Sequence, residues 1–218
     1  QDFPVTYAEL EPHLNMFELV CGTSGKAGVI NGVVQEGGNP FEGSRSQEYP
    51  LGPNPNYLGG ELFYKAAREM GYHPFPIPAS NASATYTNPY GCQMGPCNFC
   101  GFCSDYGCLN YSKASPNINI FPVLRGRKNF EMRTLAQVLK VNLTADGKMA
   151  TGVNYLDAGG QECEQPADIV ILGAFSLYNV HLMLISKIGP AYDPVTKTGT
   201  VGKNYSYQNL NRVSLFFD

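Results

Sequence analysis

The hydrophobic and polar positions near the start of the chain follow the spacing of an amphipathic helix. Thr6 and Glu9 form a capping box, which predicts that a helix begins directly after Thr6. Pro12 predicts an interruption, because a proline inside a helix removes one hydrogen bond and crowds the preceding turn. We expect the helix to resume and to end at Gly22. Its expected buried face consists of Leu14, Phe17, Val20 and Cys21.

A second helix is expected at residues 61–70. Its apolar positions fall on one stripe, and Gly71 is suited to the left-handed conformation that ends many helices. The stretches on either side, 22–60 and 73–115, are rich in turn-forming residues and show little periodicity. We therefore expect both stretches to be irregular loops.

From residue 130 onward the pattern changes to short strand-like runs that are separated by turns. Such alternation predicts a β-meander, in which consecutive antiparallel strands lie side by side. Turn residues occupy 145–148 and 157–160. The expected strands cover residues 130–134, 137–143, 149–156 and 161–164.

An almost entirely apolar run follows the meander. Asp168–Leu172 is typical of a parallel strand that is buried on both faces. Gly173 and Ala174 then form a turn of small residues, and a helical pattern runs from about residue 177 to 187. This order of elements predicts a strand, a tight turn and a helix that pack against one another.

Together these patterns predict a mixed α/β protein in two parts. Residues 1–128 form a loop-rich segment with helices, and residues 129–218 contain the meander, the buried strand and the last helix. The composition agrees, since 43% hydrophobic residues suffice for a core while 24 Gly and 16 Pro indicate many turns. No stretch of eighteen apolar residues occurs, so no membrane span is predicted.

Charge and chain ends bear on the possible partners. The formal net charge is -3 and there is no run of Lys or Arg, which argues against nucleic acid because phosphate binding needs clustered cations. The chain has no initiator Met and closes on an apolar run, Leu215–Phe217, that resembles part of a strand. We expect an internal piece of a longer polypeptide, whose remainder covers that run.

The most unusual chemistry lies in one cysteine-rich segment. Residues 92–108 contain five of the seven cysteines, three of them in a C-x2-C-x2-C pattern. Two intervening residues make a single turn, so we expect the sulfurs to converge. Lys113 lies close by and is expected to be solvated. The predicted metal ligands are Cys97, Cys100, Cys103 and Cys108, with Cys92 in reserve.

Three interpretations of the cysteines stay open at this point. An iron-sulfur cluster suits the spacing, although it departs from the bacterial ferredoxin run. Zinc is less suited, because structural zinc sites usually join two separated ligand pairs. Free thiols or disulfides form the third interpretation, in which the odd number of cysteines leaves one unpaired.

The order of these motifs resembles the glucose-methanol-choline (GMC) oxidoreductases over nearly the whole chain. The similarity runs through Tyr7–Pro12, the cysteine segment, Phe130–Val141, Asp168–Gly189 and Val201–Asn204. It is greatest to the bacterial sugar and sugar-acid dehydrogenases, which include gluconate dehydrogenase flavoprotein subunits. Some members of that branch carry an iron-sulfur cluster beside FAD.

The resemblance implies a part of a Rossmann-like FAD-binding domain and a middle portion of an FAD-dependent dehydrogenase. Such an enzyme oxidises an alcohol, a sugar or a sugar acid by hydride transfer to flavin. Val138 matches the position whose backbone meets the adenine, and Gly173 and Ala174 match the strand end near the cofactor. The catalytic histidine is expected outside this segment. A cytochrome or small subunit is the implied partner, and the implied location is periplasmic or membrane-associated.

The chain also departs from the family pattern. No G-x-G-x-x-G follows a strand, and Phe175 stands where the second family signature has Gly. The other departures are Asn179, Val180, Lys187 and Gln208. An alternative hypothesis is a non-catalytic iron-sulfur or zinc-binding electron carrier, and a third is a secreted interaction protein held by disulfides.

Overall fold

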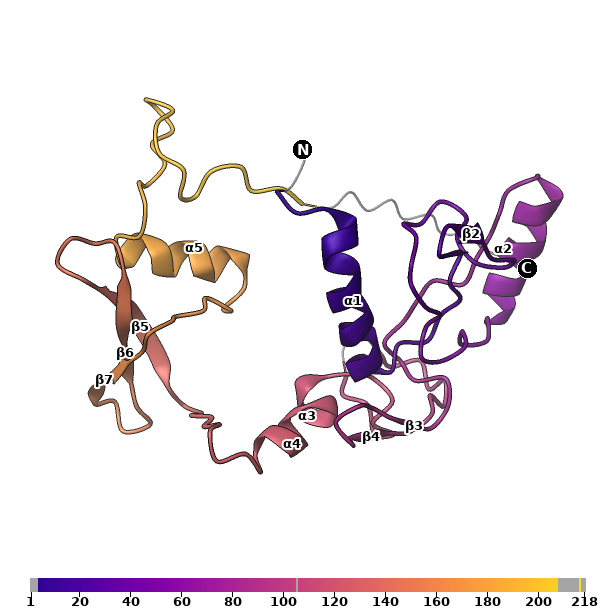
Figure 1. The fold of residues 1–218 in the computed structure, drawn as a ribbon, viewed down its shortest axis with the longest axis horizontal. Helices are drawn as coiled ribbons and strands as arrows, with labels where there is room; N and C mark the ends of the chain where they lie inside the picture. Colours follow the sequence, from indigo (N-terminus) through magenta and orange to yellow (C-terminus); the bar gives the residue numbers. More distant parts are fainter. Residues whose placement is uncertain (1–3, 105, 208–215, 217–218) are drawn as a thin grey trace. The chain divides into compact units, whose positions relative to one another are not determined.

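The chain forms two compact units in a computed structural model that describes residues 4–104, 106–207 and 216. The first unit spans Gln1–Glu131 and the second spans Met132–Asp218. Figure 1 shows helices and long loops in the first unit and a small sheet with one helix in the second. The mixed helix and strand content agrees with the predicted fold class.

Helix α1, Tyr7–Cys21, begins at the predicted capping box. The Glu9 N–H donates to Thr6 Oγ1 at 3.3 Å, and the Thr6 N–H donates to Glu9 Oε2 at 2.8 Å. The helix ends at Gly22, whose φ of 59° is left-handed. Both predicted ends of this helix are therefore confirmed.

The interior of α1 differs from the prediction in two ways. The helix runs through Pro12 without a break, because a single proline removes only one backbone hydrogen bond from a helix that is anchored elsewhere. Its buried residues include Glu11 and Asn15, whereas Leu14 is exposed and Phe17 is 63% exposed. The predicted inner face is thus confirmed at Cys21, which is buried, and wrong at Leu14 and Phe17. Polar contacts supply much of what holds the helix to its unit.

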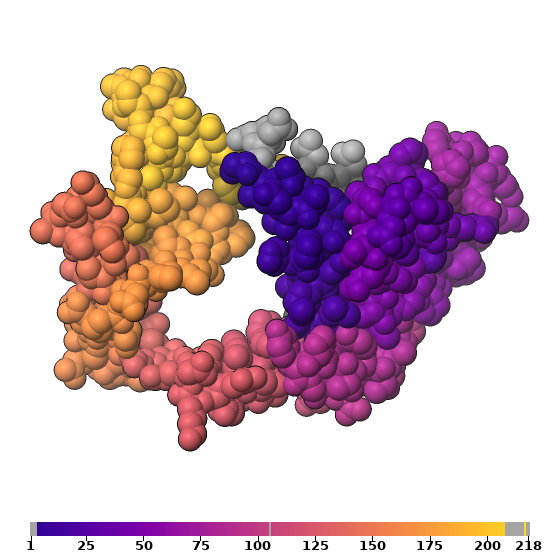
Figure 2. Space-filling view, in the orientation of Figure 1, coloured from indigo at the N-terminus to yellow at the C-terminus, as the bar shows by residue number. Residues whose placement is uncertain are grey.

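The polar contacts of α1 centre on Arg45, which is buried. Its guanidinium forms an ion pair with Glu18, and it lies 3.9 Å from the centre of the Tyr49 ring. Glu11 accepts the Ser46 N–H at 2.7 Å. Figure 2 shows the atoms of α1, in indigo, against the violet atoms of this loop. A loop with little secondary structure is therefore fixed by charged side chains.

Two further glutamates order the same loop, which contains only the short strands β1, Val29–Ile30, and β2, Val33–Val34. Glu42 accepts the Gly28 N–H at 2.6 Å and the Val29 N–H at 3.1 Å. Glu48 accepts the Ala27 N–H at 2.6 Å. These carboxylates satisfy backbone donors that no sheet ladder would satisfy. The expectation of a largely irregular 22–60 segment is confirmed.

Helix α2, Leu58–Glu69, starts three residues before the predicted position and is followed by Gly71 with a φ of 80°. Only Ala67 of its residues is buried, so most of the expected apolar stripe is exposed. The rest of the first unit contains short elements that the sequence periodicity did not predict. These are β3, Tyr86–Thr87, β4, Gln93–Met94, α3, Pro116–Asn119, and α4, Phe121–Leu124.

The second unit contains the predicted meander. Strands β5, Gln137–Leu143, β6, Ala150–Leu156, and β7, Glu162–Pro166, pair antiparallel in chain order. Helix α5, Ser176–Ile185, packs on β5, as Figure 1 shows. Ser186, directly after the helix, accepts the Val141 N–H at 2.8 Å through its hydroxyl. The helix and the sheet are thereby tied together.

Two predicted strands are absent from this part of the described chain. Residues 130–134 are irregular, and so is Asp168–Leu172, where the Ile171 side chain is 87% exposed. A parallel strand needs neighbouring strands, and the described residues of this unit supply only the antiparallel meander. The finer prediction of a Rossmann-like arrangement is therefore not seen here.

Two expectations concern the membrane and the chain end. Within the described residues, no helix has both the length and the apolar character needed to cross a bilayer. The predicted strand-like run Leu215–Phe217 lies outside the described residues except for Phe216, whose side chain is exposed.

The Arg45 cluster yields a prediction for stability. Replacing Arg45 with Ala should lower the free energy of unfolding by about 3 kcal/mol, because Glu18 would keep a largely buried charge without its partner. Urea unfolding measures the loss. The control Lys148→Ala breaks an exposed ion pair with Asp146 and should change stability by less than about 0.5 kcal/mol. Equal effects of the two substitutions would contradict the anchoring role.

The same cluster predicts sensitivity to acid. The backbone hydrogen bond from Ser46 lowers the pKa of Glu11 below its ordinary value of 4.5. A lowered folded-state pKa adds stability that is present above pH 4.5 and is lost as the pH falls through the folded pKa. Urea midpoints measured down this range should fall less steeply in Glu11→Gln than in the parent. If the urea midpoints of the two proteins fall in parallel with pH, Glu11 does not contribute to the acid sensitivity.

Candidate functional site

The predicted metal ligands occupy one exposed loop of the first unit. Cys100 and Cys103 are exposed, and Cys97 and Cys108 are half-buried. The reserve ligand Cys92 is buried beside β3 and β4. All seven cysteines are free thiols, so no disulfide holds the loop.

Hydrogen bonds to neighbouring segments position this loop. The Cys97 N–H donates to the Ala82 carbonyl at 2.8 Å, and the Asn81 amide donates to Cys103 Sγ at 3.5 Å. Lys113 donates from Nζ to the carbonyls of Cys103 and Tyr106. Lys113 is therefore half-buried and bonded to the loop backbone, whereas the sequence predicted a solvated lysine.

The loop does not assemble a metal centre in this arrangement. Among the described residues, no three His, Cys, Asp or Glu side chains lie together as a metal ion requires. The predicted convergence of the sulfurs of Cys97, Cys100 and Cys103 is thus not observed. The four cysteines share one segment without forming a ligand shell.

Cys108 has an electrostatic environment of its own. Burial raises the pKa of its thiol, but the backbone hydrogen bonds of Lys113, Ser112 and Asn110 and the Lys113 charge outweigh it and leave the pKa lowered. Cys108 also lines a cavity of about 410 Å³ together with Cys100, Phe102 and Tyr106. The segment that follows the loop therefore stabilises a thiolate at Cys108.

The residues expected near a flavin lie in the second unit. Val138 is on β5, which is an edge strand, and its pairing with β6 shifts register between Val138 and Lys140. An edge strand with such an irregularity leaves backbone donors and acceptors unpaired. A cavity of about 550 Å³, lined by Leu135, Gln137 and Asp157 among others, lies where this strand begins. Free backbone groups beside a cavity suit an adenine edge.

The turn at Gly173 and Ala174 is fixed by one side chain of α5. Asn179 accepts the Ala174 N–H at 2.8 Å and donates to the Leu172 carbonyl at 3.1 Å. A Cβ built on Gly173 would meet no atom within 4 Å, so the turn is open on that side. Asn179, where the family signature has Thr, thus takes a definite structural role that the sequence did not reveal.

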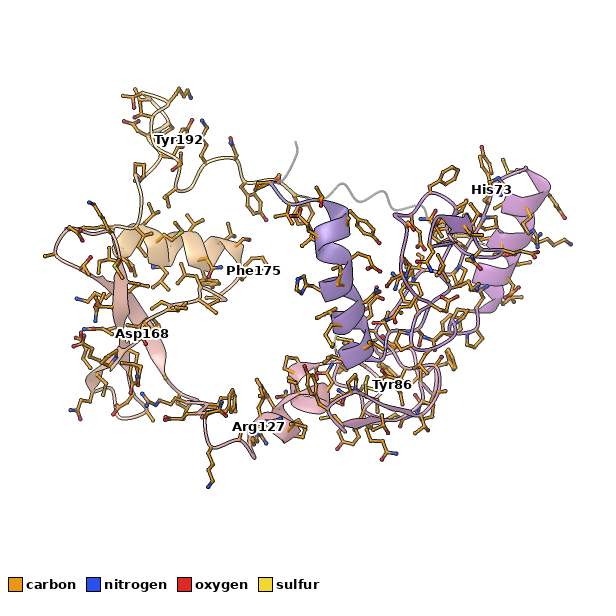
Figure 3. All side chains as sticks on the ribbon, viewed as in Figure 1. His73, Tyr86, Arg127, Asp168, Phe175 and Tyr192 are labelled. Atoms are coloured by element: carbon orange, nitrogen blue, oxygen red, sulfur yellow. The ribbon has the colours of Figure 1, made fainter. Side chains whose placement is uncertain are left out.

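Phe175 begins α5 in a backbone conformation that is normally reserved for glycine. Its φ of 70° and ψ of 153° lie in a region that costs a side-chain-bearing residue about 1–3 kcal/mol. Its ring is 65% exposed, and Figure 3 shows it at the start of the helix. The family signature has Gly at this position, and Gly adopts such a backbone conformation without strain. In this chain the backbone has that conformation although the residue is Phe175.

The three histidines are all exposed. His13 lies on α1, His73 follows α2, and His181 lies on α5. None of them belongs to the turn at Gly173 or to the cysteine loop. That none of the three is the catalytic histidine stays a prediction.

Sequence reasoning missed a large cavity of the first unit. It measures about 810 Å³ and lies between α2, the segment before α2 and the segment after it, near His73 in Figure 3. Rings of Tyr57, Phe63 and Tyr72 contribute to its walls. The aromatic residues at 57, 63, 64, 72 and 75, together with nearby prolines, were the available signal.

Comparison with known proteins gives two matches. Residues 53–209 match the family model described as GMC oxidoreductase. The chain is also 53% identical over 221 residues to a gluconate 2-dehydrogenase flavoprotein from Pantoea cypripedii. That alignment covers all of this chain and 36% of the Pantoea protein, so the chain spans about a third of that relative's length. The resemblance inferred from the motif order is confirmed.

The geometry of Phe175 generates a prediction. Phe175→Gly should leave the free energy of unfolding unchanged or raise it by about 1 kcal/mol, because relief of backbone strain offsets the added freedom of the unfolded chain. The control Leu177→Gly, inside the same helix, should lower it by about 1 kcal/mol. Chemical unfolding of both variants measures the two changes in the free energy of unfolding. Two equally destabilised proteins would rule out strain at Phe175.

Proposed function

Because this chain belongs to the GMC oxidoreductase family, we propose that it forms part of an FAD-dependent dehydrogenase acting on a sugar acid or related alcohol. The observation that carries the proposal is the 53% identity to a gluconate 2-dehydrogenase flavoprotein along the entire chain. Gluconate is therefore the substrate that we favour. Its oxidation would convert an alcohol carbon to a carbonyl.

FAD, when bound, supplies an acceptor for the hydride that leaves the alcohol carbon. The residues of this chain would hold the cofactor and would not carry out the chemistry. Backbone groups at the free edge of β5 near Val138 suit the adenine, and the open turn at Gly173 and Ala174 leaves room for close approach. The base that takes the hydroxyl proton belongs, in this proposal, to a part of the polypeptide beyond these residues.

The cysteine loop enters the proposal only as a hypothesis. Five cysteines in residues 92–108 support a relay that carries electrons away from the flavin, with Cys97, Cys100, Cys103 and Cys108 as ligands. The described conformation does not gather them into a metal site. Analysis of iron and acid-labile sulfide in the purified protein distinguishes a cluster from zinc and from free thiols.

We also propose partners and a location, which the resemblance to the bacterial sugar and sugar-acid dehydrogenases supports. A cytochrome or a small subunit would accept the electrons, and a periplasmic or membrane-associated position would suit such a chain of carriers. The remainder of the polypeptide would complete the sheet that Asp168–Leu172 lacks here. Co-purification of the native complex tests the subunit partner directly.

The proposal predicts a flavin signal that responds to substrate. The full-length protein should release FAD on acid treatment, and anaerobic addition of gluconate should bleach its visible flavin bands. Hydride transfer reduces the flavin, which is why the bands disappear.

Two comparisons sharpen that experiment. A 2-deoxy aldonic acid should leave the flavin bands intact, since it lacks the carbon-2 hydroxyl that a 2-dehydrogenase oxidises. A purified protein that holds iron or zinc but no flavin would instead favour the electron-carrier alternative. If the protein holds FAD but only simple alcohols bleach the flavin bands, the assignment to an FAD-dependent dehydrogenase stands. Gluconate as the substrate is then ruled out.

A further inference from the structure

The sequence contains a single Asn-Gly pair, and it lies in the tight turn between β1 and β2. Asn31 and Gly32 have φ values of 49° and 79°, so both central residues of the turn are left-handed. The strands that it joins pair antiparallel, with Ile30 opposite Val33. These features define a two-residue hairpin of the type I′ class, for which Asn-Gly is a preferred sequence.

An Asn-Gly pair has a chemistry of its own, because glycine has no side chain to shield its backbone nitrogen. The Gly32 nitrogen, after it loses its proton, attacks Cγ of Asn31. Ammonia leaves and a cyclic succinimide forms. Water then opens the ring at either carbonyl, which leaves aspartate or isoaspartate at position 31. The net change exchanges a water molecule for ammonia, so it requires no oxidant, reductant or metal.

Both reacting groups lie at the surface, but the attacking nitrogen is engaged. Asn31 and Gly32 are exposed, so water reaches the turn. The Gly32 N–H donates to Ser44 Oγ at 2.8 Å. A nitrogen whose proton is held by an acceptor loses that proton less readily. The reaction must therefore wait until the hydrogen bond to Ser44 opens.

The same hairpin holds the backbone of Arg45. The Arg45 N–H donates to the Val29 carbonyl at 3.0 Å, and the Asn31 N–H donates to the Arg45 carbonyl at 2.8 Å. Isoaspartate routes the main chain through the former side chain and lengthens it by a carbon atom, which breaks the register of so short a turn. The guanidinium that pairs with Glu18 would then lose its fixed position.

We propose that Asn31 is a deamidation site that Ser44 guards, and that its conversion to isoaspartate releases the loop from α1. Opening of the turn sets the rate, so the reaction reports local unfolding of this loop. The inference goes beyond the proposed function. It does not depend on flavin, substrate or metal.

Incubation of the folded full-length protein in mildly alkaline buffer, followed by trypsin digestion and mass spectrometry, tests the site. The tryptic peptide 27–45 contains both Asn31 and Asn39. Asn39 precedes Pro40, whose nitrogen has no proton to lose, so Asn39 serves as an internal control. The mass gain of deamidation should accumulate at Asn31 and not at Asn39.

Matched substitutions separate the guard from a general loss of structure. Ser44→Ala should speed the reaction at Asn31 about fivefold, which is the effect of losing one hydrogen bond of ordinary strength. Ser44→Thr keeps the hydroxyl and should react as the parent does. Gln47→Ala removes an exposed side chain of the same loop and should leave the rate unchanged. Circular dichroism verifies that each variant is folded.

The urea-denatured parent supplies the unguarded rate, which should exceed the rate of the folded parent. This ratio keeps the test decisive if Ser44→Ala does not fold. Equal rates in the folded and denatured parent, or in the parent and a folded Ser44→Ala, would overturn the guard. Equal reaction at Asn31 and Asn39 would exclude the succinimide route.

The effect on the loop has a separate readout. The deamidated protein, isolated through its added negative charge, should unfold at a lower urea concentration than the parent, as Arg45→Ala is predicted to do. Its isoaspartate content can be measured with an isoaspartyl methyltransferase as reagent. An isoaspartate fraction with the urea midpoint of the parent would overturn the link between the turn and Arg45.

Discussion

The buried ion pair between Arg45 and Glu18 is the interaction on which the first unit depends. It joins a helix to a long loop that has almost no secondary structure of its own. Glu11, Glu42 and Glu48 extend the same principle, since each accepts a backbone N–H group of the loop. Charged side chains thus replace the backbone ladder as the source of order, and the helix presents its polar side inward.

This arrangement explains why apolar residues remain outside. Leu14 and Phe17 on α1 and most of the apolar stripe on α2 are exposed, which is unusual for large side chains at helical spacing. The chain spans about a third of its Pantoea relative, so a family member of full length has much more sequence with which to cover such faces. The second unit has the same character at Asp168–Leu172, where an apolar run lacks neighbouring strands.

Sequence signals for helix ends and turns were reliable, whereas the break predicted at Pro12 and the signals that depend on tertiary neighbours were not. The capping box at Thr6, the cap at Gly22 and the turns of the meander were predictable because each is decided within a few residues. The predicted strand at Asp168–Leu172 does not form among the described residues, because a parallel strand requires partners that those residues do not supply. The inner face of α1 was predicted correctly only at Cys21, because Glu11 and Asn15 turn inward to the loop that contains Arg45 while Leu14 and Phe17 stay exposed.

In the candidate site, too, short sequence motifs were easier to predict than features that arise from tertiary packing. Val138, Gly173 and Ala174 were predicted from the family resemblance, and the structure places them at a free strand edge and in an open turn. The clamp formed by Asn179 and the aromatic cavity beside α2 have no short sequence motif, since both arise from tertiary packing. The cysteines were easy to find, but their spacing alone did not make the sulfurs converge.

The proposal to be tested is that this chain holds one side of a flavin as part of a larger sheet. A structure of the full-length protein with its cofactor, at a resolution that shows side chains, tests it most directly. We predict that the adenine lies against the edge of β5 at Val138 and that Asp168–Leu172 pairs as a parallel strand. An irregular Asp168–Leu172, with FAD bound away from β5, would contradict the account.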